Sequence, residues 1–382
     1  MSSLIEHKRV EFSELFYDLV FAYAISKSTA LIHQLDQGVL SVYTIFVYLM
    51  TLLILINCWM IQTVYTNRYG KNSLFNMVIM FINMAMMLFM SNMMTRDWSD
   101  YFRYFCIAVG TLTLSLFIQY LIEYFRDTTD ECNRQSIKSF LWMTGIRTLG
   151  LFLCVFLPYK TGIVLYLLVV IGTFIMPIIM IRGENHFFQV NFPHLIERIS
   201  LLVIIIFGEM IVGLANFFKV ETFSLSSVLY FVMMVMLFLF YFAQFDHAID
   251  ERANTKGLFL IYSHYPIFIS LFMVTVSMGF LVDSSANHLF VTAFFLAGIG
   301  MFQAAVLANG RYNKDYLRYT KSFCMVQAVL FALGSIFALL MSGTPILVIV
   351  MGTVMTVMIG IHFMRFYMIQ ARKNGKQNWH LI

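Results

Sequence analysis

Long apolar runs, separated by short clusters of charged and turn-forming residues, follow one another along the whole chain. A helix that crosses a bilayer needs about 20 mostly apolar residues. Reading from one polar break to the next predicts twelve such helices. Their predicted ranges are 11–33, 38–65, 73–94, 101–125, 137–158, 161–181, 194–217, 224–247, 257–282, 288–309, 319–341 and 345–368. The least distinct division falls between the fifth and the sixth, where Pro158, Lys160 and Gly162 indicate a turn.

The composition excludes soluble and disordered classes of protein. Hydrophobic residues make up 60% of the chain and charged residues 12%, whereas a soluble domain carries about 25% charged residues. A chain this apolar collapses or inserts into a membrane instead of staying disordered. We therefore predict an all-α, polytopic transmembrane helical bundle. The first apolar run carries acids and lacks a small-residue cleavage site, so we expect it to remain as the first span.

The distribution of lysine and arginine predicts that both termini are cytoplasmic. Positively charged residues accumulate on the cytoplasmic side of membrane proteins. With the N-terminus inside, only Arg96, Arg103, Lys160 and Lys219 fall in outer loops, and Lys27 and Arg147 fall within spans. The other 19 of the 25 basic residues are then cytoplasmic: Lys8, Arg9, Arg68, Lys71, Arg126, Arg134, Lys138, Arg182, Arg198, Arg252, Lys256, Arg311, Lys314, Arg318, Lys321, Arg365, Arg372, Lys373 and Lys376.

Polar landmarks recur at a nearly constant offset, which predicts an internal repeat. Glu14 and Glu197 are 183 residues apart, Arg68 and Arg252 are 184 apart, and Arg126 and Arg311 are 185 apart. Each half then has six spans, an even number, so the halves share one orientation, as in the parallel repeats of some transporters. We predict one six-helix membrane repeat over 1–190 and a second over 191–382. Duplication that serves packing alone remains an alternative.

Three acids inside predicted spans are candidates for handling an ion or a proton: Glu14, Asp18 and Glu209. Ionisable residues inside a bilayer are costly, so they indicate function by default. At 1.5 Å of rise per residue, Glu14 lies roughly 6 Å and Asp18 roughly 12 Å inside the first span. Glu209 falls in the outer third of the seventh. The alternative is that these acids form purely structural ion pairs.

Basic residues at similar depths are candidate charge partners for these acids. We predict that Asp18 pairs with Arg147 and that Glu209 pairs with Lys27, because the members of each pair share a depth. Arg198, near the inner end of the seventh span, is a third candidate partner. Further polar and aromatic residues in or near the inner halves of the spans are candidates to line a cavity: Tyr65, Arg68, Asp246, His247, Arg252, His264 and Tyr265. For the His264 and Tyr265 pair, a role in holding helices together is the alternative.

Motifs for other chemistry are missing from the sequence. The five cysteines are far apart, so no CxxC metal or redox pair occurs. No P-loop, GxGxxG or GxSxG motif is found. The net charge of +5 is explained by the cytoplasmic basic residues, and no stripe of base-stacking aromatics accompanies them. We expect no metal, no cofactor and no nucleic-acid partner.

Two segments resemble a known family. The run RVEFSELFYDLVFAYAIS (9–26) resembles the opening signature of the bacterial low temperature requirement A (LtrA) family, and LIERISLLVIIIFGE (195–209) resembles its second signature. Segments around Trp59 and around His264 are also similar, although Tyr241 and Phe242 stand where a later tryptophan is usual. The signature positions implied by the resemblance are Glu14, Asp18, Phe21, Glu197, Arg198, Gly208, Glu209 and His264. The acid-containing first helix is also similar, as an analogy only, to that of a proton- and potassium-conducting family.

These observations favour a transporter or channel for a small ion or solute, coupled to protons through the intramembrane acids. The resemblance implies a multi-pass protein of the bacterial cytoplasmic (inner) membrane. Its expected partners are the lipid bilayer and the ion or solute, and a homodimer is compatible with the sequence. An enzyme that acts on lipid near His264 is an alternative, although the sequence favours a non-enzymatic role. A structural or regulatory membrane protein is another.

Overall fold

The computed structural model describes residues 8–71, 73–95, 98–126, 131–183 and 190–375. Within these ranges, 12 helices are long and apolar enough to cross a membrane, which confirms the predicted number of spans. They are α1 (Phe12–Thr29), α2 (Val42–Tyr69), α3 (Leu74–Ser91), α4 (Trp98–Tyr124), α5 (Glu131–Phe156), α6 (Tyr159–Gly183), α7 (Phe192–Ala215), α8 (Leu225–Phe242), α9 (Leu258–Phe280), α10 (His288–Ala308), α11 (Lys321–Leu340) and α12 (Pro345–Lys373).

Local sequence signals set where several of these helices begin. The side chains of Ser73, Asn287 and Thr320 accept hydrogen bonds from backbone N–H groups in the first turns of α3, α10 and α11, as expected of N-cap residues. Pro345 occupies the first turn of α12, where its missing N–H is not needed. The turn predicted between the fifth and sixth spans is present, since α5 ends at Phe156 and α6 begins two residues after Leu157.

Several helix boundaries differ from the predicted ranges by a few residues, and two of them have an identifiable structural reason. The second span begins at Val42 instead of residue 38, because a tight turn with positive φ at Gln37 and Gly38 precedes it. The eighth helix ends at Phe242, and the chain then forms a π-helical turn over Ala243–Ala248. Apolar content alone marks neither boundary.

The chain divides into two compact units. The first comprises 1–32, 42–202 and 254–261, and therefore holds α1–α6 and the beginning of α7. The second comprises 33–41, 203–253 and 262–382, and holds the remainder of α7, most of α9, and α8, α10, α11 and α12. Every site described below lies within one unit.

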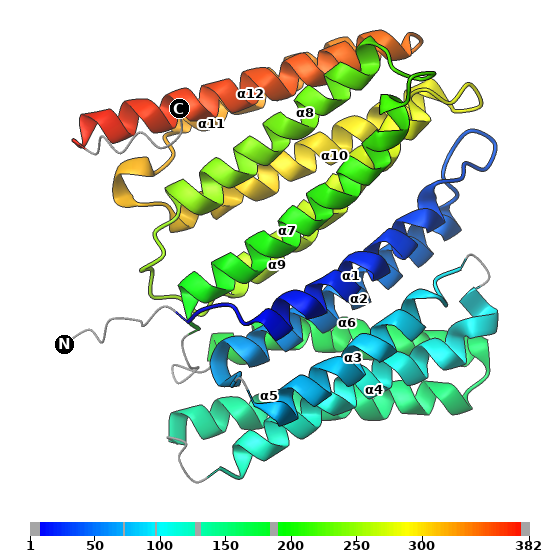
Figure 1. Cartoon of the computed structure of the whole chain (residues 1–382), viewed down its shortest axis with the longest axis vertical. Helices are drawn as coiled ribbons and strands as arrows, with labels where there is room; N and C mark the ends of the chain where they lie inside the picture. Colours follow the sequence, from blue (N-terminus) through cyan, green and yellow to red (C-terminus); the bar gives the residue numbers. More distant parts are fainter. Residues whose placement is uncertain (1–7, 72, 96–97, 127–130, 184–189, 376–382) are drawn as a thin grey trace. The chain divides into compact units, whose positions relative to one another are not determined.

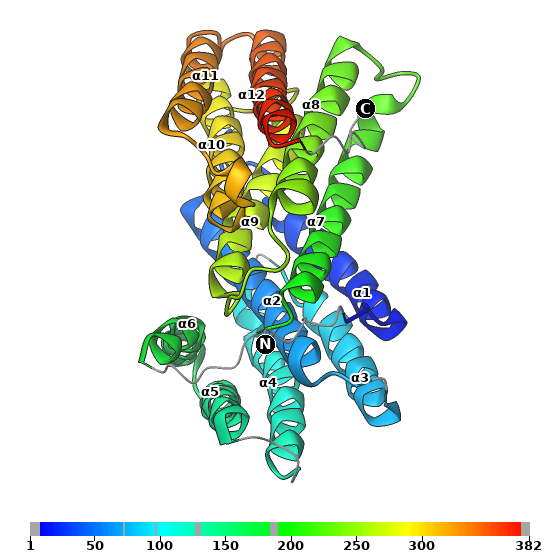
Figure 2. The same cartoon turned by 90° about the vertical axis from the view of Figure 1, so that its left-hand side faces the viewer.

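In the first unit, α1 packs on α2 and α3, α4 packs on α2 and α3, and α5 lies between α4 and α6. The two views show α5 and α6 side by side (Figures 1 and 2). In the second unit, α12 contacts α8, α10 and α11 (Figure 1). Neighbouring helices in sequence are thus often neighbours in space, as in other helical bundles.

Polar and apolar residues are distributed as a membrane requires. The exposed faces of α6 and α11 carry large apolar side chains, among them Leu168, Ile179, Leu333 and Leu340. Buried positions of the first unit include many polar side chains: Asn57, Gln62, Thr63, Asn83, Thr113, Ser115, Gln119, Thr144 and Arg147. Lipid chains cannot hydrogen-bond, so polar groups within the hydrocarbon layer must be satisfied by protein or enclosed water.

Candidate functional site

A buried ion pair joins α1 to the beginning of α7. The two terminal nitrogens of Arg198 lie 2.7 and 3.1 Å from the two carboxylate oxygens of Asp18, as a guanidinium donating to both oxygens. Trp59 of α2 donates its indole N–H to the same carboxylate at 2.8 Å, and the Arg198 guanidinium lies over the Trp59 ring. Both charged side chains are about 1% exposed. The fork and the third donor satisfy the Asp18 carboxylate and hold it in one orientation.

Glu14, one helical turn before Asp18, is held much more loosely. Its Oε2 atom lies 3.4 Å from Nε2 of His194 and 3.5 Å from Nε of Arg198. None of these three buried atoms makes a hydrogen bond with another described residue. The three polar atoms therefore face one another at separations slightly longer than ordinary hydrogen bonds. Glu14, Asp18, His194 and Arg198 together form what we call the buried charge cluster.

Asn67, near the end of α2, positions the histidine of this cluster. Its side-chain amide donates to the carbonyl of Asn191 at 2.8 Å and accepts from the Asn191 N–H at 3.0 Å. These two hydrogen bonds attach the end of α2 to the segment before α7. The same amide nitrogen lies 3.0 Å from Nδ1 of His194. With Nδ1 accepting this bond, the ring carries its N–H on Nε2, directed at Glu14.

Lys8 binds the C-terminal end of α2, close to Asn67. Its ammonium donates to the carbonyl of Thr66 and, at 2.9 Å, to the carbonyl of Gly70. A lysine at a helix C-terminus is favourable, since carbonyls there have no partner in the helix. Burial lowers the pKa of Lys8, an effect that the nearby negative charges of Glu14 and Glu11 oppose.

Asp18 does not pair with Arg147, and the predicted pair is wrong. Arg147 lies in α5, which packs between α4 and α6, whereas α1 packs on α2 and α3. The guanidinium of Arg147 instead donates to Oδ1 of Asn57 and contacts Sγ of Cys58 at 3.8 Å. Equal depth in the membrane was not sufficient to predict a contact, because depth does not specify which helices are neighbours.

Two small cavities lie in the polar interior of the first unit. The first, which we call the Glu14 cavity, is lined by Glu11, Ser13, Glu14, Gln62, Thr66, Gly70, Lys71, Asn76, Met77, Met80 and Gln119. The second, the Arg147 cavity, is lined by Tyr17, Cys58, Ile61, Gln62, Asn83, Leu112, Thr113, Leu116 and Arg147. Gln62 borders both. Gln62 therefore relates a cavity near the beginning of α1 to the one at Arg147.

The family to which the chain belongs follows from a comparison of its sequence with family models. Residues 9–357 match the model of the bacterial low temperature requirement A protein (LtrA). The chain belongs to the LtrA family. The match includes both segments that carried the resemblance, 9–26 and 195–209. In this LtrA protein the first segment supplies Glu14 and Asp18 to the buried charge cluster, and the second supplies Arg198. No curated protein sequence matches the chain.

Glu209, the third acid predicted in this LtrA chain, lies in the second unit. It is half-buried in α7 and interacts electrostatically with His33. Lys27 is exposed near the end of α1, with its ammonium 5.6 Å from the centre of the Tyr23 ring. Because Lys27 and Glu209 belong to different units, their predicted pairing stays a prediction.

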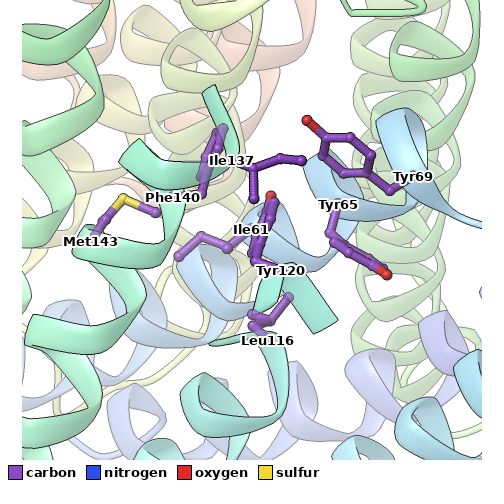
Figure 3. Close-up of a cluster of buried hydrophobic side chains, with 8 residues drawn as sticks. All are labelled: Ile61, Tyr65, Tyr69, Leu116, Tyr120, Ile137, Phe140 and Met143. Carbon is purple, nitrogen blue, oxygen red and sulfur yellow. The ribbon is translucent and has the colours of Figure 1, made fainter. Parts of the chain in front are cut away.

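Tyr65 and Arg68 lie among packed aromatic rings at the end of α2. Tyr65 is buried in a hydrophobic cluster with Ile61, Tyr69, Leu116, Tyr120, Ile137, Phe140 and Met143 (Figure 3). The rings of Tyr65, Tyr69 and Tyr120 lie within 6 Å of one another, and the Arg68 guanidinium lies over Phe140. This cluster joins α2, α4 and α5, so the structure places both residues in packing contacts and outside the lining of the two cavities described above.

The remaining predicted residues surround the end of α8 in the second unit. His264 is fully buried, its Nε2 lies 3.0 Å from the Tyr241 hydroxyl, and the Phe245 and Phe268 rings lie close to it. Tyr265 is also buried. Nearer the surface, Asp246 contacts His247 at 3.3 Å, and Arg252 is exposed beyond them. Within the described residues, no group of three or more potential metal ligands is found.

Sequence reasoning missed three residues of the site: Asn67, Gln62 and His194. His194 precedes Arg198 by four positions, which puts both side chains on one face of α7. That spacing was a usable signal. Asn67 and Gln62 gave no comparable signal, since a polar residue near the end of a span is ordinary.

Proposed function

We propose that this LtrA protein is a transporter or channel for a small ion or solute in the bacterial inner membrane. The observation that supports this most directly is the pair of cavities that share Gln62. A polar cavity inside a membrane bundle is costly unless something uses it, because each polar group there must be hydrated or paired. The lining combines acidic, amide and guanidinium groups, which suit an ion better than an apolar solute.

Glu14 is the residue best placed to handle a proton in this proposal. It lines one of the cavities, and its Oε2 atom is close to His194 and Arg198 without a hydrogen bond to either. A carboxylate in such a position can bind and release a proton with little rearrangement, since no tight bond must break. Asp18, which Arg198 and Trp59 hold with three hydrogen bonds, is better suited to positioning Arg198.

The two alternative functions find less support in the geometry. A purely structural protein would have its intramembrane charges sealed in pairs, but Glu14 and Arg147 border cavities. A lipid-modifying enzyme at His264 would need that ring to reach a substrate, but Tyr241, Phe245 and Phe268 surround it and it is fully buried. Small-ion passage through the first unit therefore remains the best-supported function.

The test is ion flux in vesicles that contain the purified full-length chain. Proton movement is followed with an enclosed pH-sensitive dye while gradients of potassium, sodium or chloride are imposed. We expect flux above that of protein-free vesicles for at least one of these ions, and a change in its pH dependence in Glu14→Gln. Glu221→Gln, which changes an exposed loop acid, is the matched control. Flux equal to that of empty vesicles for every ion would reject the proposal.

A further inference from the structure

Arg147 is a buried cation without an ion-pair partner among the described residues of the first unit. Its side chain is about 1% exposed. Its contacts are the amide oxygen of Asn57 and the thiol of Cys58, and its Nε atom has no hydrogen-bond partner. Within the described part of the first unit, no aspartate or glutamate forms an ion pair with it. A buried charge without a counter-charge is strongly unfavourable, so a neutralising partner from outside the protein would stabilise it.

A second unpartnered donor lies beside the same cavity. Gln62 is about 2% exposed, and its Nε2 atom makes no hydrogen bond within the described residues. The other end of this amide is held, because Oε1 accepts from Asn83 at 3.2 Å and Asn83 accepts in turn from Ser115 at 2.6 Å. These bonds leave the N–H groups of Gln62 as the free end of the amide, at a cavity that Arg147 also lines.

The cavity between these donors is small, with room for about one water molecule or a monatomic ion. An organic carboxylate or a phosphate is too large for a cavity of this size. A water molecule would satisfy the hydrogen bonds but would leave the charge of Arg147 uncompensated. A metal cation would be repelled by that charge. A small anion meets all three conditions of size, hydrogen bonding and charge.

We propose that the Arg147 cavity is a binding site for a monatomic inorganic anion of the chloride class, held by the guanidinium of Arg147 and the amide N–H of Gln62. Anion binding at this site is inferred from the cavity and its two donors alone. Transport of that anion across the membrane rests, in addition, on the function proposed above. Gln62 also borders the Glu14 cavity.

The test measures anion binding by the purified full-length protein in detergent. Thermal unfolding is recorded in increasing sodium chloride, with sodium gluconate as the balancing salt so that ionic strength is constant. A ligand that binds only the folded state raises the unfolding temperature in a saturable way. We expect this rise in the unaltered protein and in Arg103→Gln, which changes an exposed arginine of α4. We expect its loss in Arg147→Gln.

Gln62→Leu keeps the experiment decisive if Arg147→Gln does not fold. This variant removes the amide donor and leaves the guanidinium, so the half-saturating chloride concentration should rise at least threefold. Binding of radioactive chloride, measured on the monodisperse fraction of each protein, gives the same comparison without heating. Identical behaviour of the unaltered protein in chloride and gluconate would mean that water alone occupies the cavity, and would overturn the proposal. Chloride binding that Arg147→Gln and Gln62→Leu leave unchanged would also overturn it.

Failure of the anion site and failure of the transport proposal give different results. Chloride binding that depends on Arg147, without chloride flux in vesicles, would retain the site and reject an anion as the transported ion. Chloride flux without binding that depends on Arg147 would retain a transport function and reject this site.

Discussion

Asp18 and Arg198, 180 residues apart in the chain, form an ion pair in which both carboxylate oxygens meet both terminal guanidinium nitrogens. Trp59 reinforces the pair from α2 by donating to the carboxylate and by lying beneath the guanidinium. The pair thereby ties three helices of one unit together. It also holds Arg198 where its Nε faces Glu14. The tightly bound Asp18 carboxylate thus positions the arginine that lies beside the loosely held Glu14 carboxylate.

This geometry predicts strong coupling between Asp18 and Arg198. Breaking a buried ion pair by removing one partner costs about 3–5 kcal/mol of unfolding free energy, whereas removing both partners is often nearly neutral. Asp18→Asn and Arg198→Gln should therefore each lower the yield of folded protein and its unfolding temperature in detergent. The double variant should recover much of both.

The control is the pair of Asp18 and Arg147, which was predicted from equal depth in the membrane. Combining Asp18→Asn with Arg147→Gln should add the two defects without recovery, because the structure places no contact between those side chains. Recovery in that combination, and none in the first, would reverse the assignment.

Glu209 is predicted to act in transport and not only in stability. It is half-buried in α7, so Glu209→Gln should fold nearly normally and should reduce the flux in vesicles or remove its pH dependence. Glu221→Gln serves as the control. A Glu209→Gln protein that misfolds, and that Lys27→Met rescues, would show a structural salt bridge instead. Unchanged folding together with unchanged flux would exclude a role for this acid.

The pKa of His33 provides a measure of the charge on Glu209. Partial burial lowers the pKa of His33 below its ordinary value, and the negative charge of Glu209 raises it in part. Replacing Glu209 with glutamine removes the raising contribution, so the pKa of His33 should fall further. NMR titration of isotope-labelled histidines, with the His33 signal assigned by its loss in His33→Gln, measures this. A pKa that stays constant or rises would mean that Glu209 carries no charge close to His33.

Both termini are predicted to be cytoplasmic, because 19 of 25 basic residues then fall on the inner side. Reporter fusions after residues 97 and 382 should therefore report opposite sides of the membrane. Reports from the same side would contradict the predicted sidedness.

The number of helices was predictable because the bilayer imposes a simple rule on sequence. Each crossing needs about 20 apolar residues with all backbone groups bonded internally, so hydropathy and polar breaks suffice. Even the weak division near Pro158 was correct for this reason. The π-helical turn after Phe242 could not be predicted in the same way, because it depends on contacts with Asn313 and Lys314 that are distant in sequence.

The candidate site was predictable only as a set of residues. Glu14, Asp18 and Arg198 stood out because charges inside apolar runs are rare. Their arrangement did not follow, since depth gives a height along a helix and not the neighbour that a side chain faces. Arg147 was assigned to Asp18 because their depths can be read from the sequence but the directions in which their side chains face cannot. The Arg147 cavity depends on how Leu112, Leu116 and Gln62 pack, which no local pattern encodes.

The separation of Asp18 from Arg198 in the chain has a consequence for biogenesis. Protein synthesis proceeds at about 5–20 residues per second, so the first helix awaits its arginine for on the order of ten to forty seconds. During that interval the Asp18 carboxylate must be shielded by water, lipid headgroups or the insertion machinery. A ribosome that stalls near residue 190 would leave a six-helix intermediate with neither His194 nor Arg198. The ion pair between Asp18 and Arg198 can therefore form only after synthesis has passed the middle of the chain.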